Sequence, residues 1–260
     1  MRHVNIPIFI PHLGCPNQCV FCNQRSISGV DKFDPSSVRD IIDAALKTVS
    51  KDDDVEIAFF GGSFTGIDRE LMLELLSIGK SYIDKGVVNA LRCSTRPDYI
   101  DEQIIDILKR YGMKTVELGL QSSSDKVLEF AKRGHYFEAE KKACELIVNS
   151  SINLVGQMMI GLPGADVESE LETARFIINA GARAARIYPT VVFHDTELCK
   201  MMEHGVYEPI SIDAAVSRSA NVFSLFVENG VDILRIGLHS SERLASEETY
   251  AAGPNHPALG

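Results

Sequence analysis

The sequence predicts an α/β fold, a partial (β/α)6 barrel with a short C-terminal extension. One observation behind this prediction is that apolar segments alternate with amphipathic, capped segments along most of the chain. Such alternation requires parallel strands joined by right-handed crossovers. The other is that the unusual short motifs CPNQCVFC, GGSF, TRPD, LQSS, GLPG and YPT each follow a predicted strand. In barrels the loops after the strands converge on one face and carry the chemistry, and a doubly wound open sheet is the alternative arrangement.

Each predicted strand is a short apolar run bounded by polar or turn residues. The six runs occupy residues 3–10, 55–60, 90–95, 115–122, 152–161 and 182–189. Every run is followed by a helical pattern, so the strands are expected to lie parallel in one sheet.

Helices are predicted between the strands, and several carry a start signal. A proline directly after Asp34 is one such signal, and Asp68 is expected to cap a helix that runs to about Tyr82. The remaining helices of the core are predicted at residues 101–112, after a cap at Ser123 or Ser124, from about Phe137 to Val148, and at residues 166–180.

At 260 residues and 45% hydrophobic content, one catalytic domain is expected. Residues 1–190 are predicted to form the barrel core, and residues 191–260 an extension packed on it. The extension has helical patterns at residues 197–205 and 212–230 and an apolar strand at 231–237. Its polar tail is rich in turn residues, so neither helix nor strand is expected there. One interpretation is that the chain is truncated at this point and that a segment closing the barrel is missing.

The charge balance excludes a general affinity for nucleic acid. The formal net charge is −10 at pH 7, and no run of basic residues offers a local patch for phosphates. No apolar stretch reaches the length that spans a bilayer, and the start MRHVNIPIFIPHLGC has no signal-like cleavage pattern. The sequence therefore predicts a cytoplasmic protein that does not bind nucleic acid autonomously.

The chain has six cysteines, namely Cys15, Cys19, Cys22, Cys93, Cys144 and Cys199. An even number suggests disulfides in a small secreted protein, but this chain is neither small nor visibly secreted. The last three are dispersed and are interpreted as ordinary buried thiols. The first three are clustered, which indicates a metal site.

The clustered cysteines have the spacing C-x3-C-x2-C, directly after the first predicted strand. Thiolates suit iron–sulfur clusters, and three of them leave one iron of a 4Fe-4S cluster open for another ligand. The competing interpretation is a structural zinc site in which His12 supplies the fourth ligand. It is disfavoured because zinc at this position explains nothing about the rest of the chain.

The motif C-x3-C-x-aromatic-C, with a Gly-Gly loop after the second strand, resembles the radical S-adenosylmethionine (SAM) superfamily. Phe21 fills the aromatic position. The resemblance implies that the three clustered cysteines ligate a 4Fe-4S cluster whose open iron chelates SAM. It also implies that Gly61, Gly62 and Ser63 contact SAM, although a pair of glycines taken alone is equally typical of a plain turn.

Further motifs, STRPDYID, VELGLQS, KRGH, GLPG and RIYPTVVFHDTEL, resemble the catalytic subunit of the elongator complex over most of residues 10–200. A weaker version resembles the oxygen-independent coproporphyrinogen oxidases, whose SAM contacts carry over to Ser94, Gln121, Arg133 and Gln157. The resemblance implies that Arg133 pairs with the SAM carboxylate and that Gln121 and Gln157 bond its ribose hydroxyls. Those relatives commonly have other residues at positions 94 and 157. The alternative for all of these side chains is that each hydrogen bonds to nearby backbone groups and does not contact SAM.

Three residues near later strand ends are also candidates for the site. Tyr188 either contacts the cofactor and substrate cavity or packs with its hydroxyl bonded. Arg235 and His239 are predicted to line the substrate side of the barrel mouth, because they follow the apolar run 231–237. The alternative is a solvent-exposed arginine and a histidine in a turn.

The predicted function is that of a radical SAM enzyme. A 4Fe-4S cluster would cleave SAM reductively to a 5′-deoxyadenosyl radical, which removes hydrogen from an unidentified substrate. The expected partners are SAM and an electron donor such as flavodoxin or ferredoxin. The alternatives are elongator-like tRNA modification with a partner, small-molecule chemistry like that of the coproporphyrinogen oxidases, and a zinc-stabilised binding module or a non-catalytic electron carrier.

The chain by itself is not expected to complete tRNA modification in the elongator manner. In that family an acetyltransferase domain follows the radical SAM core, and the residues after the sixth predicted strand are too few for such a domain. A small or peptide-like substrate, or RNA presented by a partner, is expected instead.

Overall fold

The computed structural model of the chain describes residues 2–11, 13–15, 19–23, 33–238, 248–254 and 256. The strands of its main sheet are β1 (His3–Ile10), β2 (Asp54–Gly61), β3 (Ala90–Thr95), β4 (Met113–Gln121), β5 (Asn153–Ile160), β6 (Ala184–Pro189) and β8 (Asp232–Ile236). They lie side by side in that order, and every pair is parallel. All six strands predicted for the core are therefore present, and the apolar run of the extension adds a seventh.

Helices fill the crossovers. They are α2 (Val38–Leu46), α3 (Arg69–Asp84), α4 (Glu102–Arg110), α5 (Asp125–Phe130), α6 (Phe137–Asn149), α7 (Val167–Asn179), α8 (Glu197–Glu203) and α9 (Ile212–Glu228), with short 3-10 helices η1 (Pro35–Ser37), η2 (Phe64–Gly66) and η3 (Pro97–Tyr99). Among the described residues, none of these helices has the length and apolarity that crossing a membrane requires.

The helix starts agree with the sequence signals, with one exception. The Asp34 carboxylate accepts a hydrogen bond from Ser36 N at the start of η1, and the Asp68 carboxylate accepts two from the first turn of α3. Ser124 occupies the N-cap position of α5, but its side chain makes no capping bond. The cap position predicted at Ser124 is therefore confirmed, and the hydrogen bond expected from its side chain is absent.

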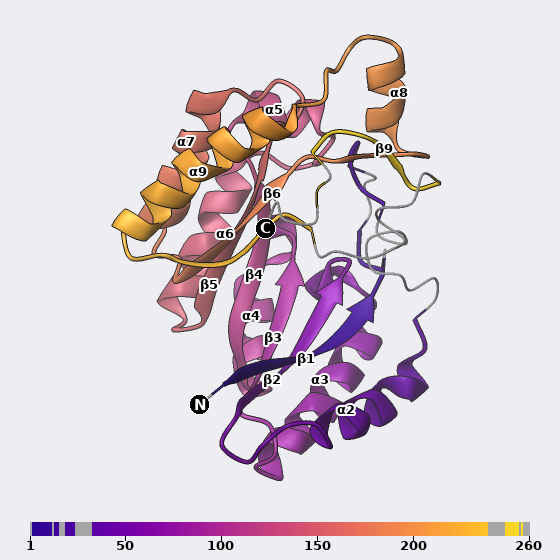
Figure 1. The fold of residues 1–260 in the computed structure, drawn as a ribbon. Coiled ribbons are helices and arrows are strands. Elements are labelled where there is room, and N and C mark those ends of the chain that lie inside the picture. The colour runs from indigo at the N-terminus through magenta and orange to yellow at the C-terminus, as the bar shows by residue number, and fades with distance from the viewer. Residues whose placement is uncertain are drawn as a thin grey trace.

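The strand order makes the sheet a half-barrel. A doubly wound sheet reverses its strand order near the middle, whereas this sheet adds each successive strand on the same side as the one before. Figure 1 shows the curl, with α2 and α3 on one flank and α6, α7 and α9 on the other. The predicted fold class is confirmed.

The two faces of the sheet have different chemistry because side chains alternate along each strand. The face under the helices is apolar, as Ile6, Ile8 and Ile10 of β1 illustrate, and it forms the main core. The inner face carries polar and charged side chains on its central strands, namely Glu56, Arg92, Glu117, Gln157 and Arg186, which hydrogen bond to one another. The concave side of the half-barrel is therefore polar.

The polar tail contains a short strand that the sequence did not predict. β9 (Tyr250–Ala252) pairs in antiparallel fashion with β7 (Val192–Phe193). The prediction that the tail lacks strands is wrong, because two- and three-residue strands are too short to show an alternating pattern. The extension also contributes β8 to the main sheet. The boundary at residue 190 stays a prediction.

Candidate functional site

The loops that follow β1 and β2 are fastened to each other by backbone hydrogen bonds. Gly62 N donates to Ile10 O at 2.8 Å, and Ser63 N donates to Leu13 O at 3.0 Å. A Cβ atom on Gly62 would lie 2.1 Å from Leu13 O, so only glycine permits this approach. Besides any ligand contact, the glycines are therefore needed to seat the cysteine loop against the end of β2.

The cysteine loop is held at a second point by Val20. Val20 N donates to Ala131 O at 3.1 Å, and Val20 O accepts from Leu198 N at 2.8 Å. Val20 is fully buried in a small apolar cluster, and Phe21 packs against the same cluster. The loop is thereby fixed between the end of α5 and the start of α8.

Cys15, Cys19 and Cys22 all belong to this loop, with Cys19 buried and the other two partly exposed. Burial raises the pKa of the Cys15 thiol, while the guanidinium groups of Arg96 and Arg133 act to lower it. In the described part of the chain, no three His, Cys, Asp or Glu side chains stand close enough together to hold a metal ion. The role of the three cysteines as cluster ligands therefore stays a prediction.

Arg133 links the cysteine loop to the end of the sheet. Its Nη1 donates to Cys19 Sγ at 3.1 Å, and its Nη2 donates to Gly119 O at 2.5 Å. Its Nε is buried and has no partner among the described residues. A buried donor without a partner is costly, so the guanidinium group is suited to a ligand that supplies the missing acceptor.

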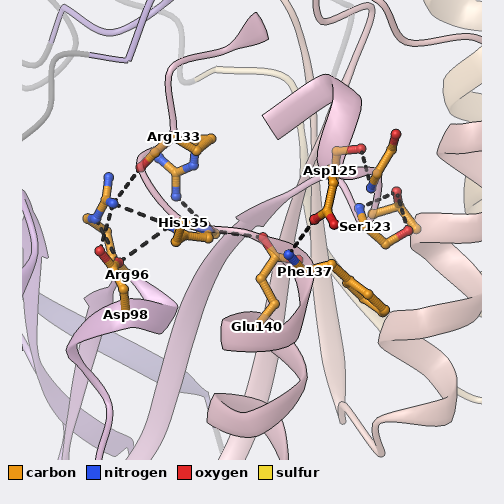
Figure 2. A network of polar contacts seen from close by, with 12 residues as sticks. Arg96, Asp98, Ser123, Asp125, Arg133, His135, Phe137 and Glu140 are labelled. Carbon is orange, nitrogen blue, oxygen red and sulfur yellow. Dashed lines mark hydrogen bonds and ion pairs between the residues drawn. The ribbon is translucent and has the colours of Figure 1, made fainter. Parts of the chain in front are cut away.

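Arg133 is joined to a largely buried polar network, drawn in Figure 2. Arg96 Nη2 donates to Arg133 O at 2.5 Å, and Arg96 forms two hydrogen bonds with Asp98 at 2.9 and 2.8 Å. His135 Nδ1 lies 3.3 Å from Arg96 Nη2, and His135 Nε2 lies 3.2 Å from Glu140 Oε1. Burial acts to raise the pKa of Asp98, but the hydrogen bonds from His135 and Arg96 hold it well below its usual value.

Glu140 gives this network a pH dependence. The residue is fully buried, and burial raises its pKa from 4.5 to about 7, while His135 acts to lower it. A carboxyl group whose pKa is higher in the folded chain stabilises the fold below its unfolded pKa, and this contribution is lost as the pH rises through the folded pKa. The parent chain should therefore lose this contribution between about pH 4.5 and pH 7.

We expect the stability of Glu140→Gln not to fall over this pH range, because the glutamine amide does not titrate and its oxygen still accepts a hydrogen bond from His135. In urea unfolding, the stability of the variant relative to the parent should improve by about 1–3 kcal/mol between pH 5 and pH 8. Glu145→Gln, an exposed change on the same helix, is the control and should show no such improvement. The prediction would be contradicted if the difference in unfolding free energy between Glu140→Gln and the parent were the same at pH 5 and pH 8.

Gln121 ends β4 in a strained conformation. Its φ is 72°, in the left-handed region that favours glycine. The pairing of β4 with β5 shifts register between Gly119 and Gln121, and a Cβ atom on Gly119 would lie 2.9 Å from Gln121 Nε2. Backbone strain of this kind concentrates at functional sites, which supports the predicted proximity of Gln121 to the cofactor.

Ser94 and Gln157 meet on the inner face of the sheet. Gln157 Nε2 lies 2.8 Å from Glu117 Oε2 and 3.4 Å from Ser94 Oγ, and both residues are half-buried. Their hydrogen-bond partners are side chains, so satisfaction by local backbone groups is not the explanation for either residue. The structure brings these two predicted residues together, and their contact with SAM stays a prediction.

Tyr188 and Arg235 belong to the same inner face. Tyr188 follows Arg186 by two positions on β6 and is half-buried, and Arg235 is the register partner of Arg186 on β8. His239, predicted beside Arg235, lies outside the described residues, as does His12 of the zinc alternative. The dispersed Cys93, Cys144 and Cys199 are buried, as predicted.

The residues around the cysteine loop fit the cofactors that the sequence implies. Arg96 Nη1 and Arg133 Nε are buried donors without a partner in the described part of the chain. Both guanidinium groups lie within electrostatic range of Cys15. Thiolates around a cluster and the carboxylate of SAM are negatively charged acceptors, which such donors suit.

Comparison with known families decides the class. Residues 9–177 match the model of the Radical SAM superfamily. The chain belongs to the radical SAM superfamily. Residues 182–260 match a second model, the Radical_SAM C-terminal domain. The chain is accordingly a radical SAM enzyme, and the cofactors implied by that superfamily are a 4Fe-4S cluster and SAM.

Curated relatives of this radical SAM enzyme are longer than the chain. It is 32% identical over 157 residues to the tRNA uridine(34) acetyltransferase of Methanocaldococcus jannaschii, an alignment that covers 59% of this chain and 29% of that protein. It is 24% identical over 256 residues to Elongator complex protein 3 of Saccharomyces cerevisiae, covering 83% of this chain and 46% of that protein. The chain thus spans less than half the length of either relative.

A solved structure shows the same fold. The archaeal Methanocaldococcus infernus Elp3 with an N-terminal deletion superposes with a TM-score of 0.76 at 22% sequence identity, covering 99% of this chain and 60% of that chain. The likeness confirms the curled parallel half-barrel of this radical SAM enzyme.

The inner-face charges and the His135–Glu140 pair were missed from the sequence as site features. A signal for the first was available, since VEIAFF, ALRCST, VELGL and ARIYP each carry one charged residue within an otherwise largely apolar strand. A charge in such a strand is tolerated when it is paired. The second was missed although its members are five positions apart, with His135 in the KRGH motif and Glu140 in the first turn of α6.

Proposed function

We propose that Cys15, Cys19 and Cys22 hold a 4Fe-4S cluster with which this radical SAM enzyme cleaves SAM reductively. The resulting 5′-deoxyadenosyl radical takes a hydrogen atom from a substrate in the half-barrel. The observation that carries the proposal is the pair of buried guanidinium groups, Arg96 and Arg133, whose free donors lie beside the cysteine loop. Such donors stabilise thiolates and bind carboxylates.

Different side chains are assigned to different parts of the cluster and of SAM. Arg133 holds Cys19 through Nη1 and has Nε free for the SAM carboxylate. Gln121, at the end of β4, and Gln157, on the neighbouring strand β5, are assigned to the ribose hydroxyls. Gly61, Gly62 and Ser63 are assigned to the methionine part of SAM, and Ser94 and Phe21 to the remaining cofactor surface. Tyr188 is assigned to the side of the cavity that faces the substrate.

The half-barrel orients the substrate and limits the access of water. A flavodoxin or ferredoxin is the proposed electron donor. We also propose a cytoplasmic location, because free thiols persist in reducing compartments.

The proposal is tested by anaerobic reconstitution of the chain with iron and sulfide, followed by addition of SAM and dithionite. We expect 5′-deoxyadenosine and methionine to form in equal amounts. The same mixture without protein is the control. A reconstituted cluster that leaves SAM intact, or stoichiometric zinc without iron in anaerobically purified protein, would overturn the proposal.

A second candidate is tRNA modification together with a partner. It is favoured by the relative named tRNA uridine(34) acetyltransferase, although the chain spans only 29% of that protein. The net charge of −10 argues against tRNA binding by the chain alone. Adding bulk tRNA to the SAM cleavage assay distinguishes the two, because stimulation by tRNA alone would favour an RNA substrate.

A further inference from the structure

The inner face of the half-barrel carries charges to which the SAM chemistry assigns no role. Arg92 bridges two carboxylates, with Nε 2.8 Å from Glu56 Oε2 and Nη1 3.1 Å from Glu117 Oε1. Arg186 donates to both oxygens of Glu117, at 2.7 and 3.2 Å, and Gln157 Nε2 donates at 2.8 Å. Glu117 thus accepts four hydrogen bonds, which fills the acceptor sites of a carboxylate.

Arg235 adds a cation that this network does not neutralise. It is the register partner of Arg186 across the β6–β8 pair, so both side chains project from the same face of the sheet. Arg235 is exposed, and within the described residues no hydrogen bond or ion pair joins it to another group. Asp232, the other charged residue of β8, pairs in register with Ala184 at the opposite end of the strand.

Arg186 and Arg235 therefore lie directly opposite each other on adjacent strands. The neighbouring carboxylate of Glu117 already accepts four hydrogen bonds and has no acceptor site left for Arg235. Like charges directly opposite each other in a sheet are destabilising. An anion bound next to Arg235 would relieve this repulsion. Gln157 on β5 is the register partner of Arg186 on the side away from β8, so the two arginines and Gln157 lie in one row across the sheet.

Tyr188 supplies a neutral donor beside the arginine pair. Burial raises the pKa of its hydroxyl, while Arg186 and Arg235 act to lower it, so the group stays protonated at neutral pH. The ring centroid of half-buried Phe60 lies 6.0 Å from the guanidinium carbon of Arg186. The surroundings thus combine a cation, a hydroxyl donor and an apolar surface, which suits an organic anion.

We propose that Arg235 and Tyr188 form a subsite for an anionic group of the substrate, a carboxylate or a phosphate, on the inner face of the half-barrel. The inference rests on the proposed function, because it assigns part of the substrate site of that enzyme. Arg235 binds either anion through its planar fork, and the Tyr188 hydroxyl donates to the same group.

Chemical modification tests the subsite at a single residue. Phenylglyoxal reacts with accessible arginines, and mass spectrometry of the full chain reports its rate at each one. Benzoate and phenyl phosphate are the probes, added at constant ionic strength. We expect one of them to slow modification at Arg235 several-fold and to leave exposed Arg175 on α7 unaffected. The more protective probe identifies the anion class, and equal or absent protection at the two arginines would overturn the proposal.

Substitutions give a second measurement by calorimetric titration with the same probes. Arg235→Gln and Tyr188→Phe should each weaken binding of the protective probe about tenfold, the usual effect of losing one strong hydrogen bond. Arg175→Gln is the matched control and should leave probe affinity unchanged. If Arg235→Gln instead weakens SAM and the probe equally in the reconstituted protein, the anion is that of SAM and the subsite proposal fails. The phenylglyoxal experiment needs neither SAM nor reductant, so a negative result in it is distinguishable from a failure of SAM cleavage.

Discussion

Cys19→Ala is expected to abolish iron binding by the reconstituted chain. A 4Fe-4S cluster on three cysteines loses a ligand that no nearby thiol replaces, and the change also removes the acceptor of the Arg133 Nη1 hydrogen bond. Iron and acid-labile sulfide should fall from about four of each per chain to almost none. The visible absorption of the cluster and the formation of 5′-deoxyadenosine should disappear with them. Cys15→Ala and Cys22→Ala are expected to give the same result.

Cys144→Ala is the matched control for these variants. Cys144 is buried in the main apolar core, whereas Val20 of the cysteine loop belongs to a separate cluster, so Cys144 is not expected to serve as a ligand. Its iron content should equal that of the parent chain. Full iron content in Cys19→Ala would contradict the assignment of the cluster to the loop.

Arg133→Ala is expected to weaken SAM binding about ten- to a hundredfold, which corresponds to roughly 1.5–3 kcal/mol. The free and buried Nε is the donor assigned to the SAM carboxylate. The cluster itself should remain, because its three thiolate ligands remain. Its reduction potential should fall, since the hydrogen bond from Nη1 to Cys19 Sγ is lost and such bonds help to set the potential. Anaerobic equilibrium dialysis with SAM and a redox titration monitored by electron paramagnetic resonance measure the two effects.

Lys132→Ala is the control, since Lys132 is exposed and paired with Glu197 on the surface. It should change neither SAM affinity nor reduction potential. Arg133→Lys should recover only part of the affinity, because an ammonium group is a point charge without the planar fork. If Arg133→Ala binds SAM as the parent does, Arg133 only shapes the cysteine loop.

Much of the fold was predictable because periodicity and caps are local properties. The apolar runs at residues 3–10 and 152–161 correspond to β1 and β5, and Asp68 caps α3 as its position indicated. β7 and β9 escaped prediction because they exist through pairing with each other across more than fifty residues. Short strands of this type are stabilised by a distant partner, so the local sequence shows little of them.

The candidate site was predictable only where residues are adjacent in sequence or match a known motif. The cysteine spacing and the KRGH motif led to Cys19 and Arg133, which are 114 positions apart and lie 3.1 Å from each other. That contact and the hydrogen bond from Arg96 to Arg133 O depend on strand register, which the sequence does not specify. The Gly61–Gly62 pair was attributed to ligand contact, and the structure adds close packing against Ile10 and Leu13.

The sheet order, which runs from β1 at one edge to β8 at the other, bears on how large a substrate can be. The interior of a fully closed barrel is reached through its ends, so the diameter limits what enters. Among the described strands β1 and β8 do not pair with each other, so a barrel diameter does not set the limit in this fold. The limit is set instead by the segments that cover the inner face between those two strands.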